Sequence, residues 1–169
     1  NMARSTLESL RQAVSRANTP DQLLEDMLHD INEESTLRLQ GAGHLVDWHH
    51  PNLIPAVMLP SLVAFNINRI MKELVSNIIR HAQAHAVKID IDISDDSLVI
   101  SITDDGVGFG GNNMTSRSEG NGLSNLRARA VEIDAQIDWQ STPHGTRTRL
   151  VLHELSQLMD KSMPESPPL

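Results

Sequence analysis

Two segments in the second half of the chain alternate apolar and polar residues with a period of two. In residues 86–93 valine and isoleucine alternate with lysine and aspartate, and residues 98–103 repeat the pattern with smaller polar residues. Alternate side chains of a strand point to opposite faces of a sheet, so each segment predicts a strand with one buried face. Residues 95–97 are typical of a turn, and the two strands are therefore predicted to form a hairpin.

A period of three to four residues governs the segment before this hairpin. The apolar residues that recur there are Val63, Ile67, Ile70, Met71, Leu74 and Ile78. This spacing predicts a long amphipathic helix. Residues 5–16 predict another helix, which carries Leu7, Leu10 and Val14 on one side.

Two more helices are indicated by their start signals. Thr19, Pro20 and Gln22 combine a capping residue, a first-turn proline and a glutamine three positions after the cap, which marks a helix N-terminus. This helix is predicted to run to about Leu39 with its apolar residues inward, namely Leu24, Met27, Leu28 and Ile31. The other helix follows Gly122, and its periodic residues are Leu123, Leu126, Ala130, Val131 and Ile133.

Shorter apolar segments complete the expected architecture. Residues 44–49, 136–140 and 147–153 predict strands, the last two joined by a turn. The sum is an α/β fold, a two-layer sandwich with helices packed on one face of a mostly antiparallel mixed sheet. We expect residues 1–155 to form a single domain and residues 156–169, which contain three prolines, to be a disordered tail.

Composition narrows the function classes. The 169 residues carry a formal net charge of −8, which argues against a surface that coats nucleic acid. The absence of cysteine excludes disulfides and thiolate metal sites, and the longest apolar run is too short to span a bilayer. Asn1 ahead of Met2 resembles a cloning remnant, so we expect the chain to be an excised piece of a longer protein.

Candidate chemistry begins where the second strand of the hairpin ends. Asp104 is followed by Gly106 and Gly108, and glycine lets the backbone turn sharply and approach a ligand. The alternative is a plain Asp- and Gly-rich turn. A second feature lies on the long helix, where Glu73, Asn77, Arg80 and His81 share one stripe beside the apolar one. The alternative there is a solvated helix face.

A third feature is the glycine pair Gly120 and Gly122 at the entry to the last helix. Unpaired backbone amides at a helix N-terminus carry partial positive charge and can hold a phosphate. The polar, glycine-rich segment 110–119 lies between this pair and the Asp104 turn. Three such features in a fixed order favour a phosphate-bearing ligand over unrelated turns.

The order of motifs resembles a known family. Glu-x-x-x-Asn on a helix, Asp-x-Gly-x-Gly-Phe after a strand, Gly-x-Gly-Leu entering a helix and Gly-Thr before a last strand occur within residues 60–153. This order is similar to the nucleotide-binding fold of sensor histidine kinases, DNA gyrase, heat-shock chaperone ATPases and mismatch-repair ATPases. Residues 77–82 and 122–130 resemble the nitrate-sensor-like branch of bacterial histidine kinases.

The resemblance implies roles for these residues. It implies that Asp104 reads the adenine amino group and that Asn77 is an oxygen ligand for Mg²⁺, which takes few protein ligands beside phosphate oxygens. Arg80 and His81 are placed to neutralise phosphate charge. The other positions carried over as nucleotide-binding are Gly106, Gly108, Phe109, Gly120, Gly122, Leu123 and Thr146. Segment 110–119 would order over ATP.

The resemblance also implies that Glu73 occupies the position where relatives place a general base, which here would take the proton from an attacking imidazole. The alternative is that Glu73 only orients a metal-bound water or pairs with a cation.

His29 resembles a phosphorylated histidine through its neighbours, but Glu34 departs from that motif, and we expect the acceptor to lie outside this chain. A metal site at His44, His49 and His50 has no second cluster to support it. Both tryptophans, Trp48 and Trp139, are interpreted as core residues.

These expectations combine into one function. The chain would bind Mg²⁺ and ATP and transfer the γ-phosphoryl group to a histidine on a separate dimerisation domain, and through it to a response regulator. Its place would be the cytoplasm, or the cytoplasmic part of a membrane-anchored sensor. The alternatives are an anti-sigma-factor-type protein-serine kinase and a nucleotide-dependent interaction module of the same fold.

Overall fold

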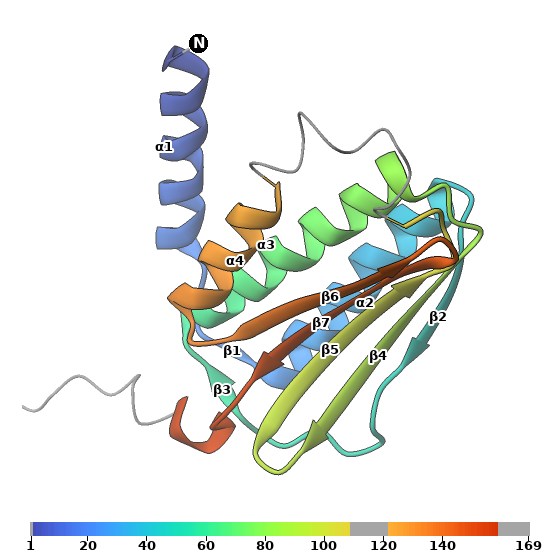
Figure 1. Ribbon diagram of the computed structural model, residues 1–169. Coiled ribbons are helices and arrows are strands. Elements are labelled where there is room, and N and C mark those ends of the chain that lie inside the picture. The colour runs from blue at the N-terminus through green and yellow to red at the C-terminus, as the bar shows by residue number, and fades with distance from the viewer. Residues whose placement is uncertain (1, 109–121, 159–169) are drawn as a thin grey trace, which may run out of the picture.

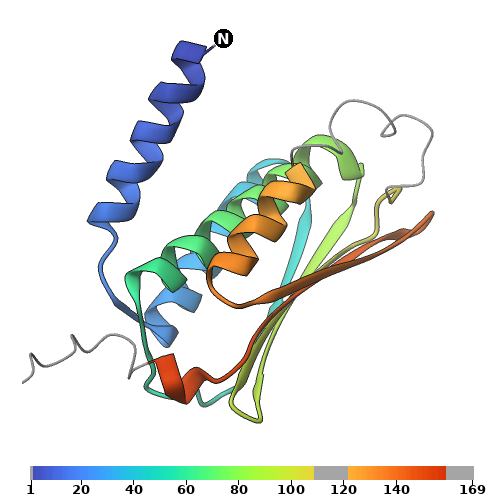
Figure 2. The ribbon, with the colours of Figure 1, turned by 60° about the vertical axis from the view of Figure 1, so that its left-hand side comes forward.

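The computed structural model describes residues 2–108 and 122–158. Helices α2, α3 and α4 lie together on one face of a five-stranded sheet, as Figures 1 and 2 show. The elements are α1 Met2–Asn18, β1 Gln22–Leu23, α2 Leu24–Gly41, β2 Leu45–His49, β3 Met58–Leu59, α3 Ser61–Asn77, a π-helix Ile78–Ala82, β4 Ala86–Ser94, β5 Ser97–Asp104, α4 Gly122–Glu132, β6 Gln136–Thr142, β7 Gly145–Leu152 and a 3₁₀ helix Leu155–Leu158.

The sheet has the strand order β2-β4-β5-β7-β6. Strand β2 pairs with β4 in parallel, and the other three pairings are antiparallel. This confirms the predicted sandwich and the hairpin of β4 and β5. The alternation that predicted the hairpin also sets its register, because Ile91 pairs with Ile100 and Ile100 with Leu150 on the face that the helices cover.

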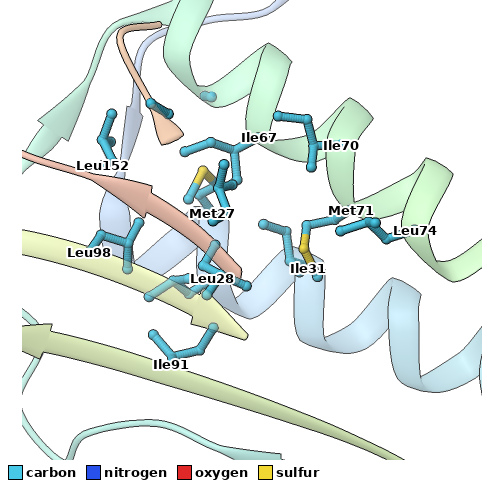
Figure 3. Close-up of a cluster of buried hydrophobic side chains, with 14 of the residues drawn as sticks. Met27, Leu28, Ile31, Ile67, Ile70, Met71, Leu74, Ile91, Leu98 and Leu152 are labelled. Carbon is cyan, nitrogen blue, oxygen red and sulfur yellow. The ribbon is translucent and has the colours of Figure 1, made fainter. Parts of the chain in front are cut away.

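The core lies between this face and helices α2 and α3. Figure 3 shows Met27, Leu28 and Ile31 of α2 beside Ile67 and Ile70 of α3, with strand residues below them. The inward positions predicted for both helices are buried, and the fold prediction is confirmed there. Within the described ranges, the structure contains no helix that combines the length and apolarity needed to cross a membrane.

Helix α1 stands apart from this core (Figure 2). None of its residues is buried, and Leu7, Leu10 and Val14 are 51%, 58% and 58% exposed. Polar contacts hold it to α4: Arg16 Nη1 lies 3.4 Å from Glu132 Oε1, and Arg129 Nη2 donates to Gln12 Oε1 at 3.3 Å. The predicted helix is therefore confirmed, with its apolar stripe turned to the solvent.

The predicted start of the second helix is wrong. Helix α2 begins at Leu24, and Gln22 and Leu23 instead pair with Leu59 and Met58 as strand β1. The carboxylate of Asp21 accepts a hydrogen bond from the backbone N–H of Ser61 at 2.8 Å. The capping chemistry is thus used on α3, which a local motif cannot reveal.

Two smaller expectations are also corrected. Val131 was counted among the periodic apolar residues of its helix, but it is 72% exposed because α4 buries Leu126 and Ala130 instead. Residues 156–158 were expected in a disordered tail, but they belong to the 3₁₀ helix, in which Leu155 and Leu158 are buried. The rest of the predicted tail, residues 159–169, lies outside the described residues.

Candidate functional site

The π-helix that follows α3 meets the turn after β5, although the contacting residues are 25 positions apart in the chain. The backbone N–H of Val107 donates to the carbonyl oxygen of Ala82 at 2.8 Å. A Cβ added at Gly106 would overlap the same carbonyl group. Only glycine therefore lets the turn come this close to the helix end. This contact brings the Asn77 stripe and the Asp104 turn together.

Asp105 fastens the turn to the start of β4. Its Oδ1 accepts hydrogen bonds from the backbone N–H groups of His85 at 2.7 Å and Ala86 at 2.9 Å. These bonds favour the ionised carboxylate and lower the pKa of Asp105 below its usual value. The role of Asp105 is therefore structural.

Asp104, one residue earlier, has a different environment. Its side chain is only 7% exposed, and Oδ1 accepts a hydrogen bond from the backbone N–H of Gly106 at 2.9 Å. Burial raises the pKa of Asp104, and the backbone amides of Gly106 and Thr146 offset part of that effect. A buried carboxylate with acceptor capacity left over can bind a hydrogen-bond donor of a ligand.

One pocket joins the helix end and the turn. Seven of the predicted site residues line it, namely Asn77, His81, Asp104, Gly108, Gly122, Leu123 and Thr146. The other lining residues are Leu74, Ile78, Ala82, Ile102, Trp139 and Thr148, none of which sequence reasoning assigned to the site. Most of these are apolar or β-branched residues of the kind that also fill cores, so no signal in the sequence set them apart.

The remaining predicted residues are placed differently. Arg80 Nη2 lies 3.8 Å from Glu73 Oε1, and Arg80 Nε donates to the Ser76 carbonyl oxygen, so both side chains sit beside the pocket and outside its lining. The stripe assumed a regular α-helix, but residues 78–82 form a π-helix, in which the angular spacing changes. His81 consequently lines the pocket and Arg80 does not. Phe109, Gly120 and segment 110–119 lie outside the described residues.

Two further glycines fit backbones together near Asp104. Gly108 has φ +70°, and a Cβ there would overlap the carbonyl group of Thr142. Gly145 has φ +143°, and a Cβ there would overlap the carbonyl group of Asp104. The glycines of the motif are therefore required by contacts within the protein, in addition to any approach of a ligand.

The sheet supplies the floor of the pocket in two rows. One row pairs Asp104 with Thr146 across β5 and β7. The next row pairs Ile102 with Thr148, and Thr148 with Trp139 of edge strand β6. Trp139 is partly buried against the core, as predicted, and it also forms a wall of the pocket.

A transition-metal centre has no support in the described residues, where no group of three His, Asp or Glu side chains could hold an ion. His44 Nδ1 lies 2.9 Å from the carbonyl oxygen of Ala84, and His49 Nε2 pairs with Asp47. Asn77 offers an amide oxygen to the pocket, and this ligand type suits Mg²⁺ bound mainly by phosphate oxygens.

Comparison with known proteins agrees with this geometry. Residues 63–156 match the family model described as histidine kinase-, DNA gyrase B-, and HSP90-like ATPase. The sensor histidine kinase NarS of Mycobacterium tuberculosis is 37% identical over 79 residues, which are 46% of this chain and 19% of that protein. The sensor protein VraS of Staphylococcus aureus is 36% identical over 90 residues, 53% of this chain and 25% of that protein. The chain thus spans at most about a quarter of these relatives.

Solved structures show the same fold at low sequence identity. The Acinetobacter baumannii histidine kinase AdeS has a TM-score of 0.61 at 18% identity, covering 88% of this chain and 76% of that one. The catalytic domain of the histidine kinase ThkA has a TM-score of 0.62 at 14% identity, covering 79% of this chain and 95% of that one.

Proposed function

This chain belongs to the histidine kinase-, DNA gyrase B- and HSP90-like ATPase family, and from that premise we propose that it binds Mg²⁺-ATP as the catalytic module of a sensor histidine kinase. The observation that carries the proposal is the shared pocket of Asn77 and Asp104, which come from different layers of the fold. An amide and a buried carboxylate that face one pocket can address the two ends of a purine triphosphate.

Asp104 selects the base. Its ionised carboxylate accepts a hydrogen bond from the exocyclic amino group of adenine. Guanine presents a carbonyl oxygen at that position, and two acceptors buried against each other are unfavourable. The burial of Asp104 makes the discrimination strong, because water cannot restore the lost hydrogen bond.

Asn77, His81 and the helix entry at Gly122 serve the phosphates. The backbone amides at the start of α4 point their partial positive charge at the pocket, which Gly122 and Leu123 line. The Asn77 side-chain oxygen would hold Mg²⁺, which supplies charge neutralisation to the triphosphate when bound.

Glu73 is proposed as the base that takes the proton from the attacking imidazole. Its side chain is 41% exposed at the rim beside the pocket, where a separate domain can reach it. Arg80 Nη2, 3.8 Å from Glu73 Oε1, pairs with this carboxylate and orients it. Transfer depends on positioning and charge stabilisation, so the chain alone should turn ATP over slowly.

The acceptor is proposed to be a histidine on a separate dimerisation domain in the cytoplasm, from which a response regulator receives the phosphoryl group. His29 is exposed on α2, whose buried side packs on α3 as part of the ATP-binding layer. This placement supports an acceptor outside the chain.

The test supplies the chain with radiolabelled ATP, Mg²⁺ and a histidine-bearing dimerisation domain. We expect acid-labile phosphate on that domain, and we expect Glu73→Gln to retain ATP binding while transfer falls by roughly a hundredfold or more. Transfer to a serine instead would overturn the proposal in favour of a serine kinase. ATP binding without transfer to either acceptor would favour a non-catalytic nucleotide module.

A further inference from the structure

Trp139 is the one tryptophan in the pocket, and it lies on the edge strand of the sheet. Its neighbour across β7 is Thr148, and Thr148 faces Ile102 on β5. With strands about 4.8 Å apart and a rise of about 3.4 Å per residue, the Cα atoms of Trp139 and Asp104 are roughly 12 Å apart. A ligand that reaches Asp104 and extends across two strands therefore meets the indole at its other end.

Arg127 covers part of this indole. Its guanidinium carbon lies 5.2 Å from the centroid of the Trp139 ring, within the range of a cation–π contact. Arg127 belongs to α4, the helix whose first residues, Gly122 and Leu123, line the same pocket. The indole thus contacts a cation of α4 and also lines the pocket that the ligand would enter.

The hydrogen bonding of the indole is incomplete. Its N–H is buried and has no hydrogen-bond partner among the described residues, whereas a buried tryptophan N–H normally finds one. The ring is consequently held by packing and by Arg127. It can shift toward a ligand without losing a hydrogen bond to that part of the chain.

From these three observations we propose that Trp139 contacts the bound nucleoside and that Arg127 is the positioning residue that braces the indole against it. The inference rests on the proposed function, because it names a further contact of the same ATP site. The contact is apolar and aromatic, so it adds affinity for a nucleoside without distinguishing adenine from guanine, which is the task of Asp104.

The wall also links the ligand to helix α4. A nucleotide that displaces the indole changes the contact between Trp139 and Arg127, five residues beyond the Gly122 entry. Binding of the nucleoside thereby changes a contact of α4, the helix that would hold the phosphates.

The chain allows a direct optical test, because Trp48 and Trp139 are its only tryptophans. Trp48 lies on β2, separated from β5 by β4, and does not line the pocket. Trp48→Phe therefore makes Trp139 the sole reporter. We expect its fluorescence to change saturably on addition of a non-hydrolysable ATP analogue with Mg²⁺, with the dissociation constant that calorimetry gives for the unaltered chain. The matched variant Trp139→Phe, which keeps Trp48, should show no such change.

Affinity supplies a second readout. Calorimetry should show that Trp139→Ala weakens binding of the analogue about tenfold, equivalent to about 1.4 kcal/mol. Arg127→Met keeps the aliphatic stem and removes the charge, and it should weaken binding about two- to fivefold while changing the amplitude of the Trp139 signal in the Trp48→Phe background.

The outcomes separate the two claims. The inference is overturned if Trp139→Ala binds the analogue with the dissociation constant of the unaltered chain and the fluorescence of Trp139 in Trp48→Phe does not change on binding. ATP binding by the chain would then still stand. Failure of the unaltered chain to bind the analogue overturns the proposed function and this inference with it. If Trp139→Ala does not fold, the fluorescence titration of Trp48→Phe still decides.

Discussion

The two ends of α3 face the same sheet but are built for different purposes. Over its first ten residues, which we call the packed end, Ile67 and Ile70 pack with residues of α2 and the strands into a closed apolar cluster (Figure 3). At the other end Asn77 and the π-helix stand over Asp104 and leave a pocket. One pair of layers therefore provides both a rigid core and a polar site.

The difference shows where the fold gains and where it loses stability. Complete burial of an aliphatic side chain such as Ile70 contributes roughly 1.5 to 3 kcal/mol. The pocket end instead buries the carboxylate of Asp104, whose raised pKa marks an unfavourable environment for the charge. The packed end stabilises the fold, whereas the pocket end keeps the Asp104 carboxylate available to accept a hydrogen bond from a ligand.

The largest expected effect breaks the packed end. Ile70→Ala removes a side chain that is 0% exposed and should destabilise the fold by about 2 to 5 kcal/mol, which urea unfolding followed by circular dichroism measures. Leu37→Ala is the matched control, because Leu37 is 72% exposed on α2. Equal losses in both variants would contradict the account of the core.

The next effect breaks the approach of the turn to the helix end. Gly106→Ala places a methyl group on the Ala82 carbonyl and should weaken ATP binding by roughly tenfold or more, as measured by calorimetry. Gly41→Ala is the control, because nothing lies within 4 Å of a Cβ there. Unchanged affinity in Gly106→Ala would show that the turn does not set the site.

The two adjacent carboxylates sharpen the comparison through pH. Burial raises the pKa of Asp104 above 3.8, the usual value for an aspartate. Its contribution to the stability of the fold is therefore full below pH 3.8 and is lost as the pH rises through the raised pKa. The lowered pKa of Asp105 means the opposite, a contribution present above pH 3.8 and lost as the pH falls through the lowered value.

At neutral pH, without nucleotide, Asp104→Asn should therefore raise the unfolding temperature, and Asp105→Asn should lower it. Thermal unfolding at neutral and acidic pH measures both shifts. Shifts in the same direction would refute the division between a ligand-binding and a structural carboxylate.

The smallest expected effect concerns the turn at the packed end. Asp96 accepts hydrogen bonds from the backbone N–H of Ser156 at 2.8 Å and from its hydroxyl at 2.7 Å. Asp96→Ala should lower the free energy of unfolding by about 1 kcal/mol more than Asp95→Ala, as measured by urea unfolding. Asp95→Ala is the control because both residues have positive φ, but the hydrogen bonds to the 3₁₀ helix are made by Asp96. Neither variant should alter ATP affinity, and a loss there would show that the two ends are coupled.

Regular periodicity explains most of what the sequence could predict. Strands β4 and β5 and helix α3 bury one face over many residues, so tertiary packing and local pattern agree there. The helix start predicted from Thr19 and Gln22 was wrong, because Asp21 next to them caps helix α3, forty residues away. The periodic pattern of the last helix did not show that Val131 is exposed, because α4 is short and buries only a narrow stripe.

The site was predictable where residue type limits the chemistry. Residue type and position selected Asn77 and Asp104, and the family resemblance added Thr146. The structure brings all three to one pocket. Arg80 lies beside Glu73 as the stripe predicts, but it does not line the pocket, because the π-helix changes the spacing after Asn77. Trp139 carried no signal, because an apolar residue in a strand is equally suited to a core and to a pocket wall.

The most direct test of the account is a calorimetric titration of the unaltered chain and of Asp104→Asn with ATP and GTP in the presence of Mg²⁺. We expect the unaltered chain to bind ATP at least roughly tenfold more tightly than GTP, and Asp104→Asn to lose roughly tenfold or more in ATP affinity and most of this preference. Equal affinity of the two proteins for ATP would contradict the claim that Asp104 and Asn77 enclose an adenine nucleotide.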